Sequence, residues 1–156
     1  IAGRKIKAVI PGGSSTPLLT PEKVDQAKMD YESIGALGSF LGSGAITVLD
    51  DSVDMVRSIY NLMKFYHHES CGQCTPCREG TGWLNRTLKR ILAGQGRKED
   101  VDMLVSVANN IEGHTICALG DAAAWPVQSF VKHFRHEFEH YIEHGHGIVE
   151  ARGRAA

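Results

Sequence analysis

The chain contains four cysteines, and three of them follow one another at intervals of three residues: Cys71, Cys74 and Cys77. The fourth, Cys117, comes 40 residues after Cys77. Three thiolates at this spacing can cover one face of an iron–sulfur cube from a single loop, leaving one iron for a ligand from elsewhere in the fold. The pattern predicts a [4Fe-4S] cluster bound by all four cysteines. Such a cube leaves no iron open to substrate, so the predicted chemistry is electron transfer.

Zinc is the main alternative for these cysteines, because two cysteines separated by two residues also form half of many zinc sites. Structural zinc usually takes two such pairs, or one pair and two histidines, whereas here three cysteines are evenly spaced and one is distant. The spacing favours the cluster and leaves a structural zinc module, serving as a docking platform, as the second hypothesis. A disulfide framework is disfavoured, since nothing marks the chain as secreted.

The residues around the cysteines suit a cluster that carries negative charge. We expect the loop to enter a helix at Thr75-Pro76 and Cys117 to precede another helix, so that two positive helix N-termini face the cluster. Gly72 lets the backbone approach the sulfurs closely. Arg78 either supplies a positive charge beside Cys77 or forms an ordinary surface salt bridge.

From residue 52 onward the apolar residues recur with the period of a helix. The first predicted helix has Asp51 or Ser52 as its N-cap and ends near His68. The second begins at Thr75-Pro76, where proline suits the first turn, and ends before Gly94.

Two more helices are predicted after Gly94. One begins at Glu99 and is closed by Gly113. For the last we expect a short turn over residues 121–125 and a main helix from Pro126, because a proline inside a helix removes a hydrogen bond. Four helices joined by short loops predict a four-helix bundle over residues 52–144, followed by a flexible tail over residues 145–156.

The first fifty residues have a different pattern. Residues 5–10 are a predicted strand followed by a loop rich in glycine and proline at residues 11–17, and residues 45–49 are a second predicted strand. Two or three strands do not make a stable sheet alone. The chain also begins with Ile1 and no methionine, so we expect the first part of a larger polypeptide to be missing. The fold class is thus mainly α, with the end of an α+β domain before the bundle.

Composition narrows the possible functions. With 156 residues, the chain is too short for a flavin enzyme with its own dinucleotide fold. Its 17 basic and 18 acidic residues give a net charge of −1, and the basic residues are scattered, which disfavours nucleic-acid binding. There is no apolar run long enough to span a bilayer and no export signal, so we expect a soluble protein without membrane insertion.

Several motifs closely resemble the flavin-bearing, NADH-oxidising F subunit (51 kDa type) of respiratory complex I. The likeness covers nearly the whole chain: residues 1–51 resemble the C-terminal part of its ubiquitin-like β-grasp (SLBB-like) domain, and the rest resembles its helical iron–sulfur bundle. The motifs are Val9-Ile10-Pro11-Gly12-Gly13-Ser14-Ser15, Glu69-Ser70-Cys71-Gly72-Gln73-Cys74-Thr75-Pro76-Cys77-Arg78-Glu79-Gly80, Ile111-Glu112-Gly113-His114-Thr115-Ile116-Cys117-Ala118-Leu119-Gly120-Asp121 and Ala124-Trp125-Pro126-Val127.

This resemblance implies a function. In the family, the four matched cysteines hold a [4Fe-4S] cluster that takes single electrons from FMN, which NADH has reduced, and passes them toward quinone. It also implies that Ala118 and Leu119 lie between the cluster and the flavin, where ordinary core packing is the alternative role. The family's glycine-rich FMN and NADH segment is not in this chain, so NADH dehydrogenase activity is expected only of the complete protein.

The resemblance further implies partners and a location. The partners would be other subunits of the peripheral arm, especially the small thioredoxin-like [2Fe-2S] subunit and the large iron–sulfur subunit. The location would be peripheral, on the cytoplasmic side of the bacterial inner membrane or the matrix side in mitochondria. Diaphorase subunits of NAD-linked hydrogenases and formate dehydrogenases use similar motifs, and they remain an alternative.

Overall fold

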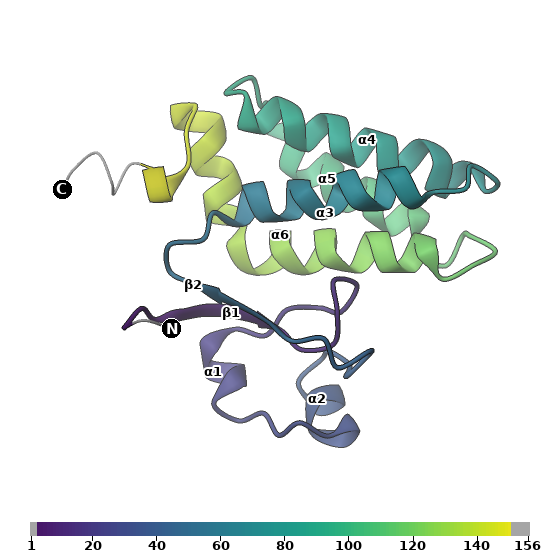
Figure 1. Ribbon diagram of the computed structural model, residues 1–156. Coiled ribbons are helices and arrows are strands. Elements are labelled where there is room, and N and C mark those ends of the chain that lie inside the picture. The colour runs from purple at the N-terminus through teal and green to yellow at the C-terminus, as the bar shows by residue number, and fades with distance from the viewer. Residues whose placement is uncertain (1–2, 151–156) are drawn as a thin grey trace. The chain divides into compact units, whose positions relative to one another are not determined.

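The computed structural model of the chain describes residues 3–150 and is mainly α, as predicted, with 57% helix and 7% strand. The chain divides into two compact units between Val53 and Asp54 (Figure 1). Among residues 3–150, no helix combines the length and the apolar character that crossing a bilayer requires.

The first unit contains a small antiparallel sheet. Strand β1 (Ile6–Ile10) pairs with β2 (Thr47–Asp50), so both predicted strands are confirmed within two residues at their ends. The short helices α1 (Pro21–Val24) and α2 (Tyr31–Ala36) lie in the connection between them. The apolar core of this unit consists of Ala8, Val9, Ile10, Leu18, Leu19 and Ile34.

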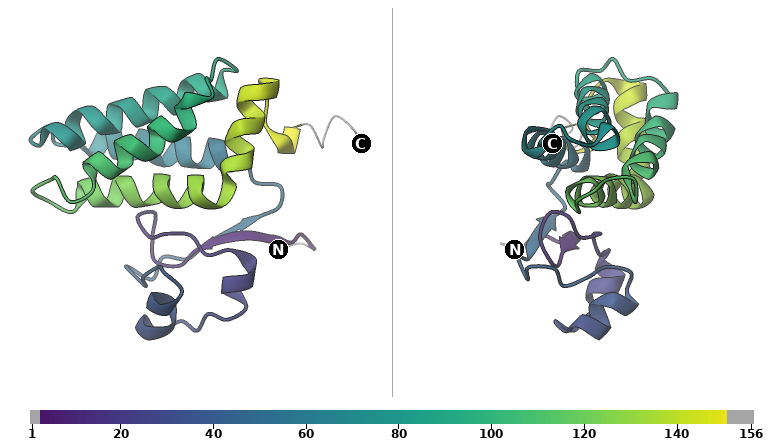
Figure 2. Two further views of the ribbon diagram at one scale, coloured as in Figure 1. Left: turned by 180° about the vertical axis from the view of Figure 1, so that it is seen from behind. Right: turned by 90° about the vertical axis from the view of Figure 1, so that its right-hand side faces the viewer.

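The second unit consists of helices. Its elements are α3 (Met55–Glu69), α4 (Thr75–Leu92), α5 (Glu99–Ile111) and α6 (Leu119–His144). Helix α3 packs against α4 and α6, α4 packs against α5 and α6, and α5 packs against α6 (Figures 1 and 2). The largest side chains of its core, each less than 2% exposed, are Met55, Ile59, Met63, Leu84, Leu88, Ile91, Phe130, Phe138 and Tyr141.

Most predicted helix boundaries in this unit are confirmed. Helix α4 starts at Thr75 with proline in its first turn, and Gly94 follows its end with φ of 70°. Helix α5 starts at Glu99, and Gly113 follows its end with φ of 72°. These positive φ values are ones that glycine adopts without steric cost, which is why both helices end there.

The predicted N-cap of α3 is wrong. The cap is Asp54, whose Oδ1 accepts a hydrogen bond of 2.9 Å from the Arg57 N–H. Ser52 belongs instead to a turn that follows β2, in which its N–H and hydroxyl both donate to the Asp50 carboxylate. These bonds occupy Ser52 in the turn, so the helix begins at the next residue that can cap it.

The predicted break before Pro126 is also wrong. Helix α6 begins at Leu119 and continues through Pro126, which is buried inside it. Ala123 and Ala124 are fully buried, and alanine has the highest helix propensity, so packing and propensity offset the hydrogen bond that proline cannot donate. The helix bends further along, at Phe134, where φ is −127° and ψ is 25° (Figure 2).

Helix α6 ends at Gly145, a left-handed C-cap whose N–H donates to the Tyr141 carbonyl. Of the predicted tail, residues 145–150 are described. Gly147 among them is buried, close to the Tyr141 hydroxyl. Residues 151–156 lie outside the described residues, so the flexible tail stays a prediction.

Candidate metal centre

Three of the four cysteines lie in the connection between α3 and α4 or in the first turn of α4. Ser70 caps the end of α3, and its N–H donates to the Tyr66 carbonyl at 3.1 Å. Cys71 is exposed, Cys74 is half-buried and forms the N-cap of α4, and Cys77 is buried in the first turn of α4, 6% exposed. The three cysteines thus lie at and just before the N-terminus of α4, and the predicted entry of this loop into a helix at Thr75-Pro76 is confirmed.

The fourth cysteine lies in the segment between α5 and α6. The Asp121 carboxylate accepts a hydrogen bond of 2.7 Å from the Gly113 N–H, so the first turn of α6 is joined to the end of α5. Inside this closed segment the Thr115 hydroxyl donates to the Cys117 carbonyl at 2.9 Å. Cys117 itself is exposed and directly precedes Ala118, the N-cap of α6.

Glu112 holds the same segment from its other side. Its carboxylate accepts from the Trp125 Nε1–H and from the Gln128 side-chain amide, both at 2.7 Å. The hydrogen bonds from Gln128 and then Trp125 favour the ionised form and lower the pKa of Glu112 below its ordinary value. The sequence did not indicate this contact, because periodicity carries no information on pairing between segments.

The two cysteine-bearing segments meet at one end of the second unit. The Ile116 backbone N–H donates to Cys74 Sγ at 3.3 Å, which joins the neighbour of Cys117 to the middle cysteine of the first loop. Figure 1 and the left view of Figure 2, which is seen from behind, both show the α3–α4 and α5–α6 connections at the same end of the helices. A backbone N–H aimed at a sulfur is the kind of donor that stabilises a cysteine-bound cluster.

All four cysteines are free thiols. Across residues 3–150, no group of three or more His, Cys, Asp or Glu side chains is placed to hold a metal ion. A tetrahedral zinc site needs its sulfurs about 2.3 Å from one ion, whereas a cube binds each thiolate through a different iron and spaces them further apart. Four cysteine sulfurs, one for each iron of a cube, are a donor set that suits a [4Fe-4S] cluster.

Gly72 and Arg78 shape the first loop. Gly72 has φ of 82°, a conformation that a residue with a side chain adopts only with strain. Arg78 Nη1 donates to the Gly72 carbonyl at 2.8 Å and Nη2 to the Thr75 hydroxyl at 3.3 Å, while Nε forms a surface ion pair with Glu79 at 3.0 Å. The surface salt bridge considered for Arg78 is therefore present, and the guanidinium also holds the loop through Gly72 and Thr75.

The residues beside Cys117 face outward. Ala118 is exposed and Leu119 half-buried, and Ile116 is 86% exposed. Ala118 therefore does not belong to the apolar core that residues 3–150 form. This apolar surface next to the fourth cysteine is available to another molecule or chain segment.

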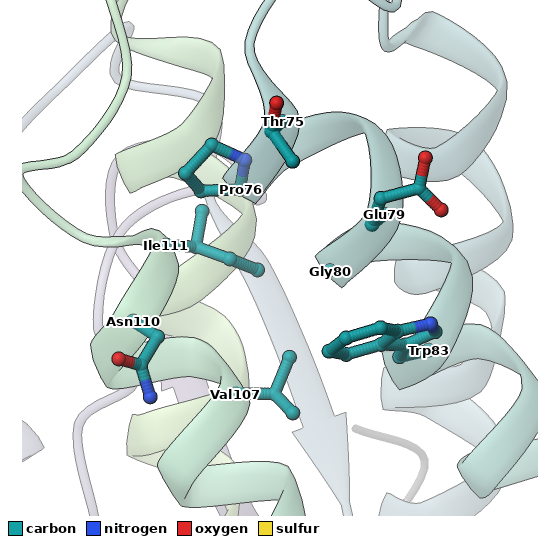
Figure 3. Close-up of a pocket in the computed structure, with 8 residues that line it drawn as sticks. All are labelled: Thr75, Pro76, Glu79, Gly80, Trp83, Val107, Asn110 and Ile111. Carbon is teal, nitrogen blue, oxygen red and sulfur yellow. The ribbon is translucent and has the colours of Figure 1, made fainter.

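Trp83 does not pack in the core. It is 52% exposed and lines a shallow pocket beside the start of α4 (Figure 3). Thr75, Pro76 and Glu79 line the same pocket from α4, and α5 contributes Val107 and Ile111.

Gly120 is a sensitive position of the Cys117 segment. A Cβ at this position would meet Thr115 Oγ1 and would lie 2.6 Å from Thr115 Cγ2 and 2.9 Å from Thr115 Cβ, and rotation of the Thr115 side chain cannot move its Cβ away. We expect Gly120→Ala to displace Thr115 and with it Cys117, to cost about 1–3 kcal/mol of stability, and to lower the iron content after reconstitution.

Gly35→Ala is the matched control, because Gly35 is also helical and nothing lies within 4 Å of its added Cβ. Iron and sulfide analysis with urea denaturation measures both effects. Equal iron contents and equal stabilities in the two variants would contradict the role assigned to the Gly120–Thr115 contact.

Four free cysteines on two converging segments of a helical unit form the donor set typical of an iron–sulfur protein. The chain belongs to the family described as the NADH-ubiquinone oxidoreductase-F iron-sulfur binding region, whose family model matches residues 57–141.

Individual relatives agree with this family. The chain is 56% identical over 138 residues to the F subunit of NADH-quinone oxidoreductase of Rickettsia bellii, covering 88% of this chain and 33% of the relative. It is 54% identical over 136 residues to an F subunit, numbered 1, of the same enzyme in Rhizobium meliloti, covering 87% and 31%. The chain thus spans about a third of the length of the curated relatives it matches.

A solved structure has the same fold. An NAD+-reducing [NiFe]-hydrogenase in the H2-reduced state superposes with a TM-score of 0.78 at 30% identity, covering 89% of this chain and 24% of that chain. The similarity extends into both units, since this match includes more of the chain than the second unit alone.

Proposed function

We propose that this chain is the electron-transfer part of the F subunit of an NADH-quinone oxidoreductase, with a [4Fe-4S] cluster held by Cys71, Cys74, Cys77 and Cys117. The observation that carries the proposal is the hydrogen bond from the Ile116 N–H to Cys74 Sγ, because it joins the fourth cysteine's segment to the loop of the other three. The cluster, when bound, supplies one-electron oxidation and reduction without bond rearrangement.

The protein contributes position and charge to this site. The N-terminus of α4 begins at Cys74 and that of α6 at Ala118, so each cysteine segment ends at a positive helix terminus. An anionic cluster gains from both termini. Arg78 adds a fixed positive charge within the first loop, where it also holds the Gly72 carbonyl.

Ala118 and Leu119 are proposed to lie on the path between the cluster and an FMN bound by another part of the complete protein. Ala118 is exposed and Leu119 half-buried, which supports this role, since a residue that contacts a flavin must not be fully covered by its own helical unit. NADH would reduce that flavin, and oxidation of NADH would belong to the complete protein.

We also propose the finer architecture that the family suggests. Residues 52–144 would form the four-helix iron–sulfur bundle, and residues 145–156 a flexible tail. Residues 1–51 would form the C-terminal part of a β-grasp domain, which is supported by the two-stranded sheet, because two strands need further strands or a partner to be stable.

The proposed partners are other peripheral-arm subunits of the complex, especially a small thioredoxin-like [2Fe-2S] subunit and the large iron–sulfur subunit. The site would face the cytoplasm in bacteria or the matrix in mitochondria. A second candidate function is a diaphorase subunit of an NAD-linked hydrogenase or formate dehydrogenase, which the similarity to the NAD+-reducing hydrogenase supports.

Metal analysis of the anaerobically purified chain tests the proposal. We expect a brown protein with about four iron and four sulfide per chain, and a paramagnetic signal on one-electron reduction. A colourless protein with one zinc would instead establish the structural zinc module. Purification of the native complex separates the candidate enzymes: nickel would identify a [NiFe]-hydrogenase, formate oxidation a formate dehydrogenase, and NADH-dependent quinone reduction an NADH-quinone oxidoreductase.

A further inference from the structure

Ser70 directly contacts one of the cysteine sulfurs. Its Oγ lies 3.2 Å from Cys77 Sγ. Both residues are fixed by helix ends: Ser70 caps α3 through its N–H, which donates to the Tyr66 carbonyl, and Cys77 lies in the first turn of α4. The contact therefore joins two helices at the site.

The direction of this hydrogen bond follows from the chemistry of the ligand. A cysteine that binds iron does so as a thiolate, which has no proton to donate. The Ser70 hydroxyl must then be the donor and Cys77 Sγ the acceptor. Within residues 3–150, Oγ of Ser70 has no second hydrogen-bond partner that would compete for its proton.

The surroundings of Cys77 strengthen such a bond. Cys77 is buried, whereas Cys71 and Cys117 are exposed to solvent. A hydrogen bond is electrostatically stronger away from water, because the local dielectric constant is lower. Among the four sulfurs, Cys77 is thus the one at which a single hydroxyl has the largest effect.

We infer that Ser70 tunes the reduction potential of the cluster by donating a hydrogen bond to Cys77. This inference rests on the proposed function. Reduction adds an electron to an already anionic cluster, so a donor to sulfur stabilises the reduced form more than the oxidised form. Ser70 acts through Cys77 and raises the potential without binding iron.

Redox titration of the reconstituted 156-residue chain tests the inference. We expect Ser70→Ala to lower the equilibrium constant for one-electron reduction about three- to tenfold, where tenfold corresponds to about 59 mV. Ser70→Thr, which keeps the hydroxyl, is expected to stay near the unaltered protein. The potential is followed by electron paramagnetic resonance, so the test does not depend on enzyme activity.

Ser58→Ala is the matched control, because the Ser58 hydroxyl on the same helix donates to the Asp54 carbonyl and not to sulfur. An intact cluster in Ser70→Ala with an unchanged potential would overturn the inference and leave the proposed function standing. If Ser70→Ala loses the cluster, Ser70→Thr and Ser70→Val are compared, because these two side chains have the same shape and only threonine has a hydroxyl. A lower potential in the valine variant supports the inference. Equal potentials in the two variants, or loss of the cluster from both, overturn it. A cluster absent from the unaltered chain refutes the proposed function itself.

Discussion

Cys74→Ser is expected to remove most of the iron and sulfide from the reconstituted protein while the helices remain. Serine offers a hard oxygen where iron–sulfur clusters prefer soft thiolate, and its shorter C–O bond moves the acceptor away from the Ile116 N–H. The helices should survive because Cys74 is the N-cap of α4 and does not belong to the buried stripes. Iron and sulfide analysis measures the site, and far-UV circular dichroism measures the helices.

The control for this variant is Gln73→Ala, which changes an exposed residue of the same loop that is not a proposed ligand. It should retain about four iron per chain, as expected of a complete cube. A Cys74→Ser protein with undiminished iron would refute this cysteine as a ligand. Loss of helix together with iron would instead show that metal binding and folding are coupled, as in small metal-dependent domains.

Phe138→Ala is expected to destabilise the second unit by about 3–5 kcal/mol, the range for removing a large aromatic side chain from a core. Phe138 is fully buried on α6, beyond the bend at Phe134. Whole domains are stable by only about 5–15 kcal/mol, so this single change should remove a large part of the folding free energy. Urea denaturation followed by circular dichroism measures the loss.

Phe65→Ala provides the comparison, since Phe65 is 50% exposed on α3 and its truncation leaves no closed cavity. We expect less than about 1 kcal/mol for it. Similar losses in both variants would mean that the burial of Phe138 contributes little. Together with Cys74→Ser, this pair separates the stability of the scaffold from metal binding at the site. Cys74→Ser should lower the iron content, whereas Phe138→Ala should lower the stability of the helices.

The positions of the long helices could be predicted from short stretches of sequence. The helical period located the four long helices, and Gly94 and Gly113 marked two of their ends, because helix formation and termination depend on residues within about one turn of each other. The expected chemistry came from cysteine spacing in the same way. The prediction at Pro126 failed because packing prevailed there: burial of Ala123 and Ala124 keeps the helix continuous.

The arrangement of the site was decided by the tertiary structure. The sequence contains Ile116 and Cys74, Asp121 and Gly113, and Ser70 and Cys77, but it does not state that these pairs lie within hydrogen-bond distance. Their contacts depend on how the helices pack, which fixes where the connecting segments meet. Residue types and spacing thus determined which atoms could bind a cluster, whereas packing determined which donors face the sulfurs, because only the folded chain brings distant backbone and side-chain groups within reach of one another.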